Sequence, residues 1–242
     1  MRLYLIACEV IYREMCAAIA HAPNLVDARF MPKALHDIGA GKMRASLQKE
    51  IDAVDASRYD AIVLGYALCG CGVAGLRAGS TPLVIARAHD CIGLLLGGVD
   101  PRLDDANKRC FYRSTGWIER AAESDSCAFN SIVGDVGRSL DQFVERYGED
   151  NGRYLYEEFS RHQHNYDQLV YIRTGVEPDA SFASAAQREA HEKGWRFSAI
   201  DGSMRLFTSL LAGEWSQDDF AIAPPGSTFA ASYDDRIMRV IP

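Results

Sequence analysis

Wholly apolar runs that alternate with helical patterns limit the folds open to this chain of 242 residues. Residues 60–68 and 82–88 are almost continuously apolar, and residues 2–7 form a shorter run of the same kind. A strand that is apolar along its whole length is buried on both faces, which is typical of a parallel sheet with helices on either side. The sequence therefore predicts an α/β fold.

The rest of the pattern extends this alternation towards the C-terminus. Further strands are expected at residues 26–31, 169–172, 196–200 and 220–223, and helices at residues 9–20, 43–54, 140–163, 183–193 and 204–212. We expect two Rossmann-like lobes with helices on both faces of each sheet. Residues 1–135 would form the first lobe, and residues 136–242 would supply a helical connector and the second lobe. The alternative is one sheet to which both halves contribute strands.

Charge and composition narrow the classes of partner. The formal net charge is -7 and the sequence pI is about 5.4, so the chain repels phosphate backbones and anionic lipid surfaces. We therefore expect a small-molecule substrate, and neither nucleic acid nor a membrane as the main partner. No secretory signal and no apolar run of membrane-spanning length is recognisable, which favours a cytoplasmic protein.

Cysteines follow three of the expected strands. Cys8 comes after the first strand, and Cys69 and Cys91 come after the two fully apolar strands, with His89 close to Cys91. Ligands bind outside the carboxyl ends of parallel strands, and these ends share one edge of the sheet. We therefore expect Cys8, Cys69, Cys91 and His89 to form a metal site. The alternative is that the thiols are ordinary buried side chains.

Three thiols and an imidazole suit zinc, which takes tetrahedral Cys and His ligands and keeps a position open in catalytic sites. An iron–sulfur cluster is the alternative cofactor, because it also uses cysteine thiolates. Cys71 lies two residues after Cys69. At this spacing its side chain could bind the same metal or could point away from the site. Cys16 lies within the first helix and is interpreted as core. Seven cysteines in all, an odd number, fit poorly with a complete set of disulfides.

Other residues near these strand ends are candidates for chemistry or binding. Glu9 and Asp90 are candidate catalytic acids or bases, and Asp90 could instead orient His89. For Glu9 the alternative is a favourable charge at a helix start. Arg87 is a candidate for binding a substrate anion, or is a surface charge.

Glycines and aromatic residues complete the candidate substrate-binding set. Gly70 and Gly72 would allow close backbone approach or a positive φ beside the metal. Tyr112 and Trp117 would form walls of the pocket, and the alternative for both is a place in the core.

Several segments resemble a known family. They are Ala7-Cys8-Glu9, Tyr12-Arg13-Glu14, Leu64-Gly65-Tyr66-Ala67-Leu68-Cys69-Gly70, Arg87-Ala88-His89-Asp90-Cys91-Ile92, Gly116-Trp117 and Tyr147-Gly148-Glu149-Asp150-Asn151. They resemble the DUF1638 family of bacterial and archaeal proteins over roughly residues 3–230. The resemblance implies a link to corrinoid-dependent methyl transfer and one-carbon metabolism, with a corrinoid protein as partner. It also implies Asn at the position of Cys71, which leaves Cys8, Cys69 and Cys91 as the stronger set.

Three functions remain open on the sequence. The first is a metal-dependent enzyme, such as a methyltransferase or an accessory to one, with a walled pocket over the thiols. The second is a metal- or corrinoid-binding accessory protein without turnover, which would hold an exposed, labile metal. The third is a metal-free cysteine enzyme of racemase type, in which two facing thiols act as acid and base.

Overall fold

The computed structural model describes residues 1–36, 39–98, 109–120, 140–163 and 166–242, and it is a mixed α/β structure in which parallel strand pairs dominate. The first sheet has the strand order β2-β1-β3-β4-β8. Its strands are β1 (Arg2–Cys8), β2 (Leu25–Met31), β3 (Ala61–Gly65), β4 (Leu83–Ala86) and β8 (Phe220–Ala223). The first four are parallel, and β8 is antiparallel to β4.

Apolar sequence explains the centre of this sheet. All residues of β3 and β4 are buried, as the continuous apolar runs predict. The chain leaves β1 for β2 on one side and then returns for β3 on the other. The strand order therefore reverses between β1 and β3. Ligands of open parallel sheets usually bind at the carboxyl ends of the strands beside such a reversal.

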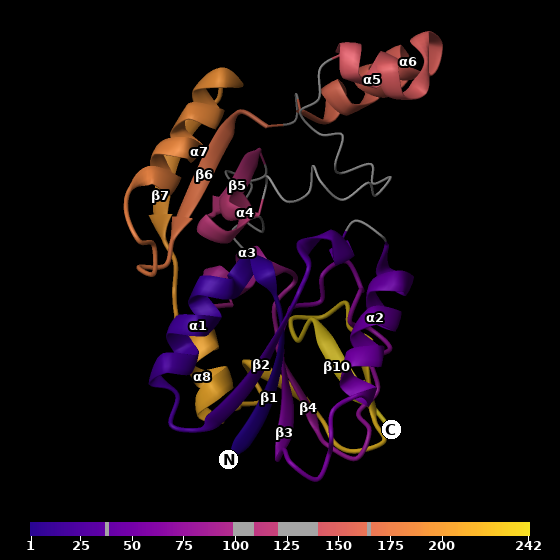
Figure 1. Ribbon diagram of the computed structural model, residues 1–242, viewed down its shortest axis with the longest axis vertical. Coiled ribbons are helices and arrows are strands. Elements are labelled where there is room, and N and C mark those ends of the chain that lie inside the picture. The colour runs from indigo at the N-terminus through magenta and orange to yellow at the C-terminus, as the bar shows by residue number, and fades with distance from the viewer. Residues whose placement is uncertain (37–38, 99–108, 121–139, 164–165) are drawn as a thin grey trace.

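Helices cover both faces of the first sheet (Figure 1). Helices α1 (Tyr12–His21) and α8 (Arg205–Ala212) lie together on one face, and α2 (Ala40–Asp52) lies on the other. Strands β9 (Thr228–Ala231) and β10 (Met238–Ile241) form an antiparallel pair near the second face. Short helices follow three strand ends: η1 (Glu9–Ile11), η2 (Lys33–His36) and α3 (Cys91–Leu95).

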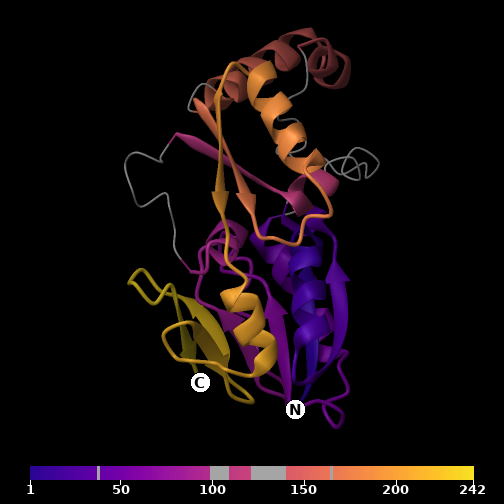
Figure 2. The ribbon, with the colours of Figure 1, turned by 90° about the vertical axis from the view of Figure 1, so that its left-hand side faces the viewer.

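A second, fully parallel sheet has the order β5-β6-β7 (Figure 2). Its strands are β5 (Cys110–Ser114), β6 (Gln168–Arg173) and β7 (Arg196–Asp201), and α7 (Ser181–Glu192) packs on β6 and β7. Helix α4 (Thr115–Glu119) follows β5 and contacts α7 and η1. Helices α5 (Leu140–Tyr147) and α6 (Glu149–Gln163) occupy the predicted long helix, with a break at Gly148, whose φ is +82°.

Both halves of the chain contribute to both sheets. Strand β5 comes before residue 135 but pairs with β6, and β8 comes after it but pairs with β4. The predicted boundary itself lies within residues 121–139, outside the described part of the chain, as does Cys127. One large core joins the first sheet to Tyr112, Val170 and Ile172 of the second. No helix of the described ranges is long and apolar enough to cross a membrane.

Candidate functional site

Three cysteines from separate segments of the chain line one cavity at the carboxyl edge of the first sheet. Cys8 is the last residue of β1, Cys69 follows β3, and Cys91 is the first residue of α3. The cavity has a volume of about 10 Å³, which is close to the smallest space that holds one water molecule. The structure thus brings together the three thiols that strand endings predicted.

His36 joins these thiols, although it is not among the residues that the sequence predicts for the site. It ends η2, lines the same cavity, and places its Nε2 atom 3.5 Å from the Cys8 sulfur. A signal for it was present in the sequence: His36 lies five residues after Met31, the end of β2. Strand β2 is parallel to β1, so its carboxyl end belongs to the same edge of the sheet.

His89 does not take the predicted place beside the thiols. Its side chain is exposed and is not among the residues that line the cavity. Its contribution is to the backbone, since its carbonyl accepts a hydrogen bond from the N–H of Cys69 at 2.8 Å. The imidazole at this cavity is therefore that of His36.

Burial keeps two of the thiols neutral when no metal is bound. Burial is the main reason that the pKa of Cys8 is raised to about 12, and nearby Cys91 and Glu9 contribute to this rise. Burial also raises the pKa of Cys69 well above its ordinary value, with Cys91 as the next contribution. The three thiols affect one another because they line the same cavity.

Nearby polar hydrogens favour the charged form of all three sulfurs. Backbone hydrogen bonds at Val10 and Ala67 lower the pKa of Cys8 and Cys69 respectively, so they favour the thiolate. The indole Nε1–H of Trp117 donates to the Cys91 sulfur at 3.3 Å. Donors of this kind stabilise metal-bound thiolates and tune the site around them.

Trp117 reaches the cavity because of the glycine before it. A Cβ atom at Gly116 would lie 1.7 Å from the carbonyl oxygen of Val10, so only glycine lets α4 approach η1 this closely. Trp117 lines the cavity. Tyr112 is also buried, but it belongs to the core and not to the cavity lining.

The turn after β3 has an unusual backbone. Residues Cys69, Gly70 and Cys71 have φ values of 47°, 59° and 69°. Positive φ is uncommon outside glycine, and its occurrence at two cysteines is a local strain of the kind that clusters at functional sites. Cys71 itself is exposed and does not line the cavity. A Cβ at Gly72 would meet the Met43 sulfur at 2.4 Å, so this glycine allows the turn to pack on α2.

The two predicted catalytic carboxylates are bound to backbone N–H groups. Asp90 caps α3 and accepts hydrogen bonds from the N–H groups of Ile92 and Gly93 at 3.0 and 3.2 Å. Glu9 accepts one from the N–H of Lys33 at 2.6 Å. Asp90 thereby fixes the helix that carries Cys91, and Glu9 joins η1 to η2.

Arg87 makes internal contacts where a substrate contact was expected. Its guanidinium donates to the carbonyl oxygens of Gln217, Phe220, Arg236 and Met238. These four carbonyl oxygens engage the Nε and Nη1 atoms of the guanidinium. Arg87 therefore ties β4 to the C-terminal segment.

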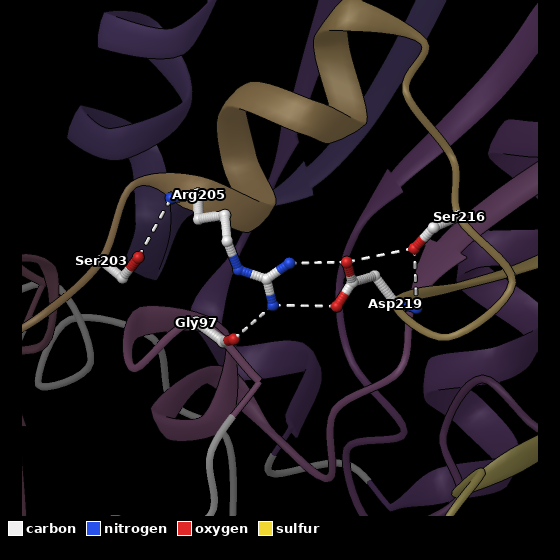
Figure 3. A network of polar contacts seen from close by, with 5 residues as sticks. All are labelled: Gly97, Ser203, Arg205, Ser216 and Asp219. Carbon is white, nitrogen blue, oxygen red and sulfur yellow. Dashed lines mark hydrogen bonds and ion pairs between the residues drawn. The ribbon is translucent and has the colours of Figure 1, made fainter.

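A second arginine braces the segment after α3 (Figure 3). Both terminal nitrogens of Arg205 bind the Asp219 carboxylate, at 2.5 and 2.8 Å, and one also donates to the Gly97 carbonyl at 2.7 Å. Ser216 supports the carboxylate with a hydrogen bond of 3.1 Å. The network links α8, the loop before β8 and the end of the α3 segment, so it helps to hold Cys91 in place.

Across the described ranges, no group of three or more His, Cys, Asp or Glu side chains is arranged so that it could hold a metal ion. The three thiols and one imidazole are nevertheless a set of donors that zinc accepts. Because they are not arranged around a common point, metal binding would require these four side chains to move closer together.

Comparison with models of protein families gives a match over most of the chain. A family model described as "Protein of unknown function (DUF1638)" matches residues 30–211. No curated protein and no solved structure matches the chain. The matched segment contains His36, Cys69, Cys91 and Trp117, whereas Cys8 precedes it.

Proposed function

The chain belongs to the DUF1638 family of proteins of unknown function, and we propose that it binds one zinc ion through the thiolates of Cys8, Cys69 and Cys91, with His36 as fourth ligand. The observation that carries this proposal is the distance of 3.5 Å between the Cys8 sulfur and His36 Nε2. A tetrahedral zinc ion with a sulfur ligand at about 2.3 Å and a nitrogen ligand at about 2.0–2.1 Å separates the two atoms by roughly 3.5 Å.

Protons compete with a metal ion for these thiols. Cys8 and Cys69 are protonated when no cation is bound beside them, as their raised pKa values indicate. A bound metal ion reverses this, since it deprotonates a coordinating thiol outright. The hydrogen bond from Trp117 to Cys91 then stabilises a charged sulfur.

Size favours a single ion over a cluster. The cavity volume of about 10 Å³ suits one ion bound by surrounding side chains, whereas an iron–sulfur cluster adds several iron and sulfide atoms. Zinc is therefore the first choice, and an iron–sulfur cluster stays the alternative cofactor.

We further propose that the site is catalytic and serves methyl transfer or an accessory step of corrinoid or one-carbon metabolism. Zinc holds a bound thiol as the thiolate, which is the nucleophilic form. An incoming thiol would take the place of His36, because catalytic zinc sites keep three protein ligands and one exchangeable position. A corrinoid protein is the proposed methyl donor, and a small thiol is the proposed acceptor.

Two other functions use the same residues. A metal- or corrinoid-binding accessory protein would need an exposed, labile metal, whereas Cys8 is only 4% exposed. A metal-free cysteine enzyme is favoured by the contact between Cys8 and His36, because an imidazole beside a thiol can act as its base. The raised pKa of Cys8 argues against a metal-free cysteine enzyme, because it keeps the thiol in its neutral form.

The two sheets correspond to the two lobes that we propose for this fold. We propose that the five-stranded and three-stranded sheets are the cores of two Rossmann-like lobes, with α5 and α6 as the helical connector. The parallel pairing within each sheet supports this arrangement.

Metal analysis of single variants tests the proposed site. Protein purified without oxygen is expected to contain zinc in a 1:1 ratio. Cys69→Ser is expected to lose most of this zinc, and His36→Ala is expected to bind zinc more weakly than the parent. Cys16→Ser removes a thiol of α1 that does not line the cavity, and His89→Ala removes the exposed imidazole. Both controls should keep their zinc. Loss of zinc in His89→Ala but not in His36→Ala would contradict the ligand set.

A further inference from the structure

Strand β2 forms an open edge of the first sheet. It pairs with β1 on one side, and no strand of the described ranges pairs with its other side. All seven of its residues pair with β1 in unbroken register, and it contains no proline, glycine or lysine. Proteins usually protect an edge strand of this length with a bulge or with such residues, or cover it with another element. Strand β2 therefore has the properties of a strand that a partner covers.

The backbone groups of β2 face β1 and the open edge in turn. The N–H of Leu25 donates to the carbonyl oxygen of Met1, next to the start of β1, at 3.1 Å. Every second residue after Leu25 faces β1 in the same way, because the direction of the backbone groups alternates along a strand. The N–H and C=O groups that point to the open edge are therefore those of Val26, Ala28 and Phe30.

The sequence of β2 is complementary to itself in the antiparallel direction. A two-fold axis at Ala28 places Asp27 opposite the partner's Arg29, and Val26 opposite the partner's Phe30. Pairs of opposite charges and pairs of aromatic with β-branched residues stabilise neighbouring strands. An axis at Asp27 or at Arg29 would instead place two like charges opposite each other. Charge thus selects the register that is centred on Ala28.

The backbone supports the same register. Ala28 points its N–H and C=O groups outward, so it can exchange two hydrogen bonds with the partner's Ala28. Asp27 and Arg29 then occupy the pairs without backbone hydrogen bonds, where facing Cα atoms are only about 4.5 Å apart. Leu25, which is 71% exposed in the single chain, would lie opposite the partner's Met31.

The two charged side chains keep capacity for such a contact. One oxygen of Asp27, Oδ2, accepts hydrogen bonds from Arg2 and Tyr59, whereas Oδ1 makes none with the described residues. Arg29 contacts Glu50 through Nε at 3.7 Å, which leaves its terminal nitrogens for another acceptor. The side chains of Asp27 and Arg29 are 46% and 58% exposed.

We propose that two copies of this chain form a dimer through antiparallel pairing of their β2 strands around Ala28. The two five-stranded sheets would then form one continuous sheet. This interface does not depend on the proposed zinc site, because none of the four proposed ligands lies on β2.

Sedimentation equilibrium of charge variants tests the interface and its register. The parent is expected to have twice the chain mass of 26.7 kDa. Arg29→Asp creates two pairs of facing acids, and Asp27→Arg creates two pairs of facing arginines. Each is expected to raise the dissociation constant of its dimer about tenfold or more. An equimolar mixture of the two variants restores both complementary pairs, so it should form a heterodimer about as tightly as the parent forms its dimer.

Ala28→Pro tests the backbone contacts without a change of charge. The Ala28 N–H faces away from β1, so proline removes no hydrogen bond of the chain itself and is tolerated at such an edge position. This variant is expected to be monomeric with the circular dichroism spectrum of the parent. It decides the question if Asp27→Arg, which loses the contacts with Arg2 and Tyr59, does not fold.

Arg239→Asp is the matched control, because Arg239 is an exposed arginine of another edge strand, β10. It should remain a dimer. A parent that is monomeric at its highest soluble concentration would overturn the proposal, as would a folded Ala28→Pro that stays dimeric. Failure of the two folded charge variants to associate with each other would overturn the register. Dissociation by Arg239→Asp but not by Arg29→Asp would place the interface elsewhere and overturn the role of β2.

Discussion

Single side chains set the properties of the thiol cavity, and Cys8 is the clearest case. It is almost completely buried, and its contact with His36 joins β1 to η2. Cys8, Cys69 and Cys91 can be predicted to lie together from the sequence, because parallel strand ends share an edge. His89 is the imidazole that the sequence favours because it lies close to Cys91 in the chain, whereas His36 lies at the cavity. Adjacency in sequence is a weak guide at a turn, where successive side chains point in different directions.

Glu14 is another buried titratable residue, and it lies outside the cavity. It is 1% exposed, and one carboxylate oxygen accepts a hydrogen bond from Thr174 at 2.8 Å while the other has no partner in the described structure. Burial raises the pKa of Glu14, and Glu177 and Glu119 raise it further. The protonated form is therefore favoured by folding.

We predict that the free energy of unfolding falls as pH rises through the Glu14 titration. A group whose pKa is raised in the folded state stabilises the protein below its unfolded pKa, and this contribution is lost as pH passes the folded value. Glu14→Gln should remove this fall and be the more stable protein at higher pH. Urea unfolding on both sides of the ordinary glutamate pKa measures the effect. Glu192→Gln, at an exposed position of α7, should keep the parent pH dependence.

At the scale of elements, close contact between η1 and α4 positions one wall of the cavity. Gly116 allows this contact, and Trp117 follows it directly. Gly116→Ala is expected to lower the free energy of unfolding by about 3 kcal/mol or more, because the added carbon meets backbone and not a movable side chain. Urea unfolding and Trp117 fluorescence would report the change.

Gly79 provides the comparison for that variant. A Cβ there would meet nothing within 4 Å, so Gly79→Ala should change stability by no more than about 0.5 kcal/mol. Equal stability of the two alanine variants would show that the contact between α4 and η1 is not as close as described.

Elements that the sequence predicted are those with an unambiguous pattern. Strands β3 and β4 are apolar throughout, and the helical period marks α2 and α7. Strand β5 escaped prediction because its burial alternates and it contains a charged residue, Arg113. The antiparallel direction of β8 could not be predicted either, because a four-residue apolar strand has the same pattern in both directions.

At the scale of the whole molecule, each half of the chain contributes a strand to the sheet that is formed mainly by the other half. Strand β8 completes the edge of the first sheet, and β5 forms one edge of the second. Arg87 adds four hydrogen bonds between β4 and the C-terminal segment. The cavity therefore depends on residues far apart in sequence.

We predict that residues 1–135 and 136–242, expressed separately, do not fold. Each fragment would leave a sheet without a strand and expose the unpaired edge that remains. Circular dichroism and amide chemical-shift dispersion of the fragments would measure this. Co-expression should restore a folded complex if the fragments need only each other. A well-dispersed spectrum from either fragment alone would contradict this prediction, because it would show that the fragment folds without the strand that the other half contributes.

The shared metal ion of Cys8, Cys69 and Cys91 is the central claim, and X-ray absorption at the zinc edge tests it most directly. Protein isolated without oxygen should show three sulfur ligands at about 2.3 Å and one nitrogen at about 2.0–2.1 Å around zinc. A first coordination sphere of oxygen and nitrogen alone, or the absence of stoichiometric zinc from protein supplied with it, would contradict the claim.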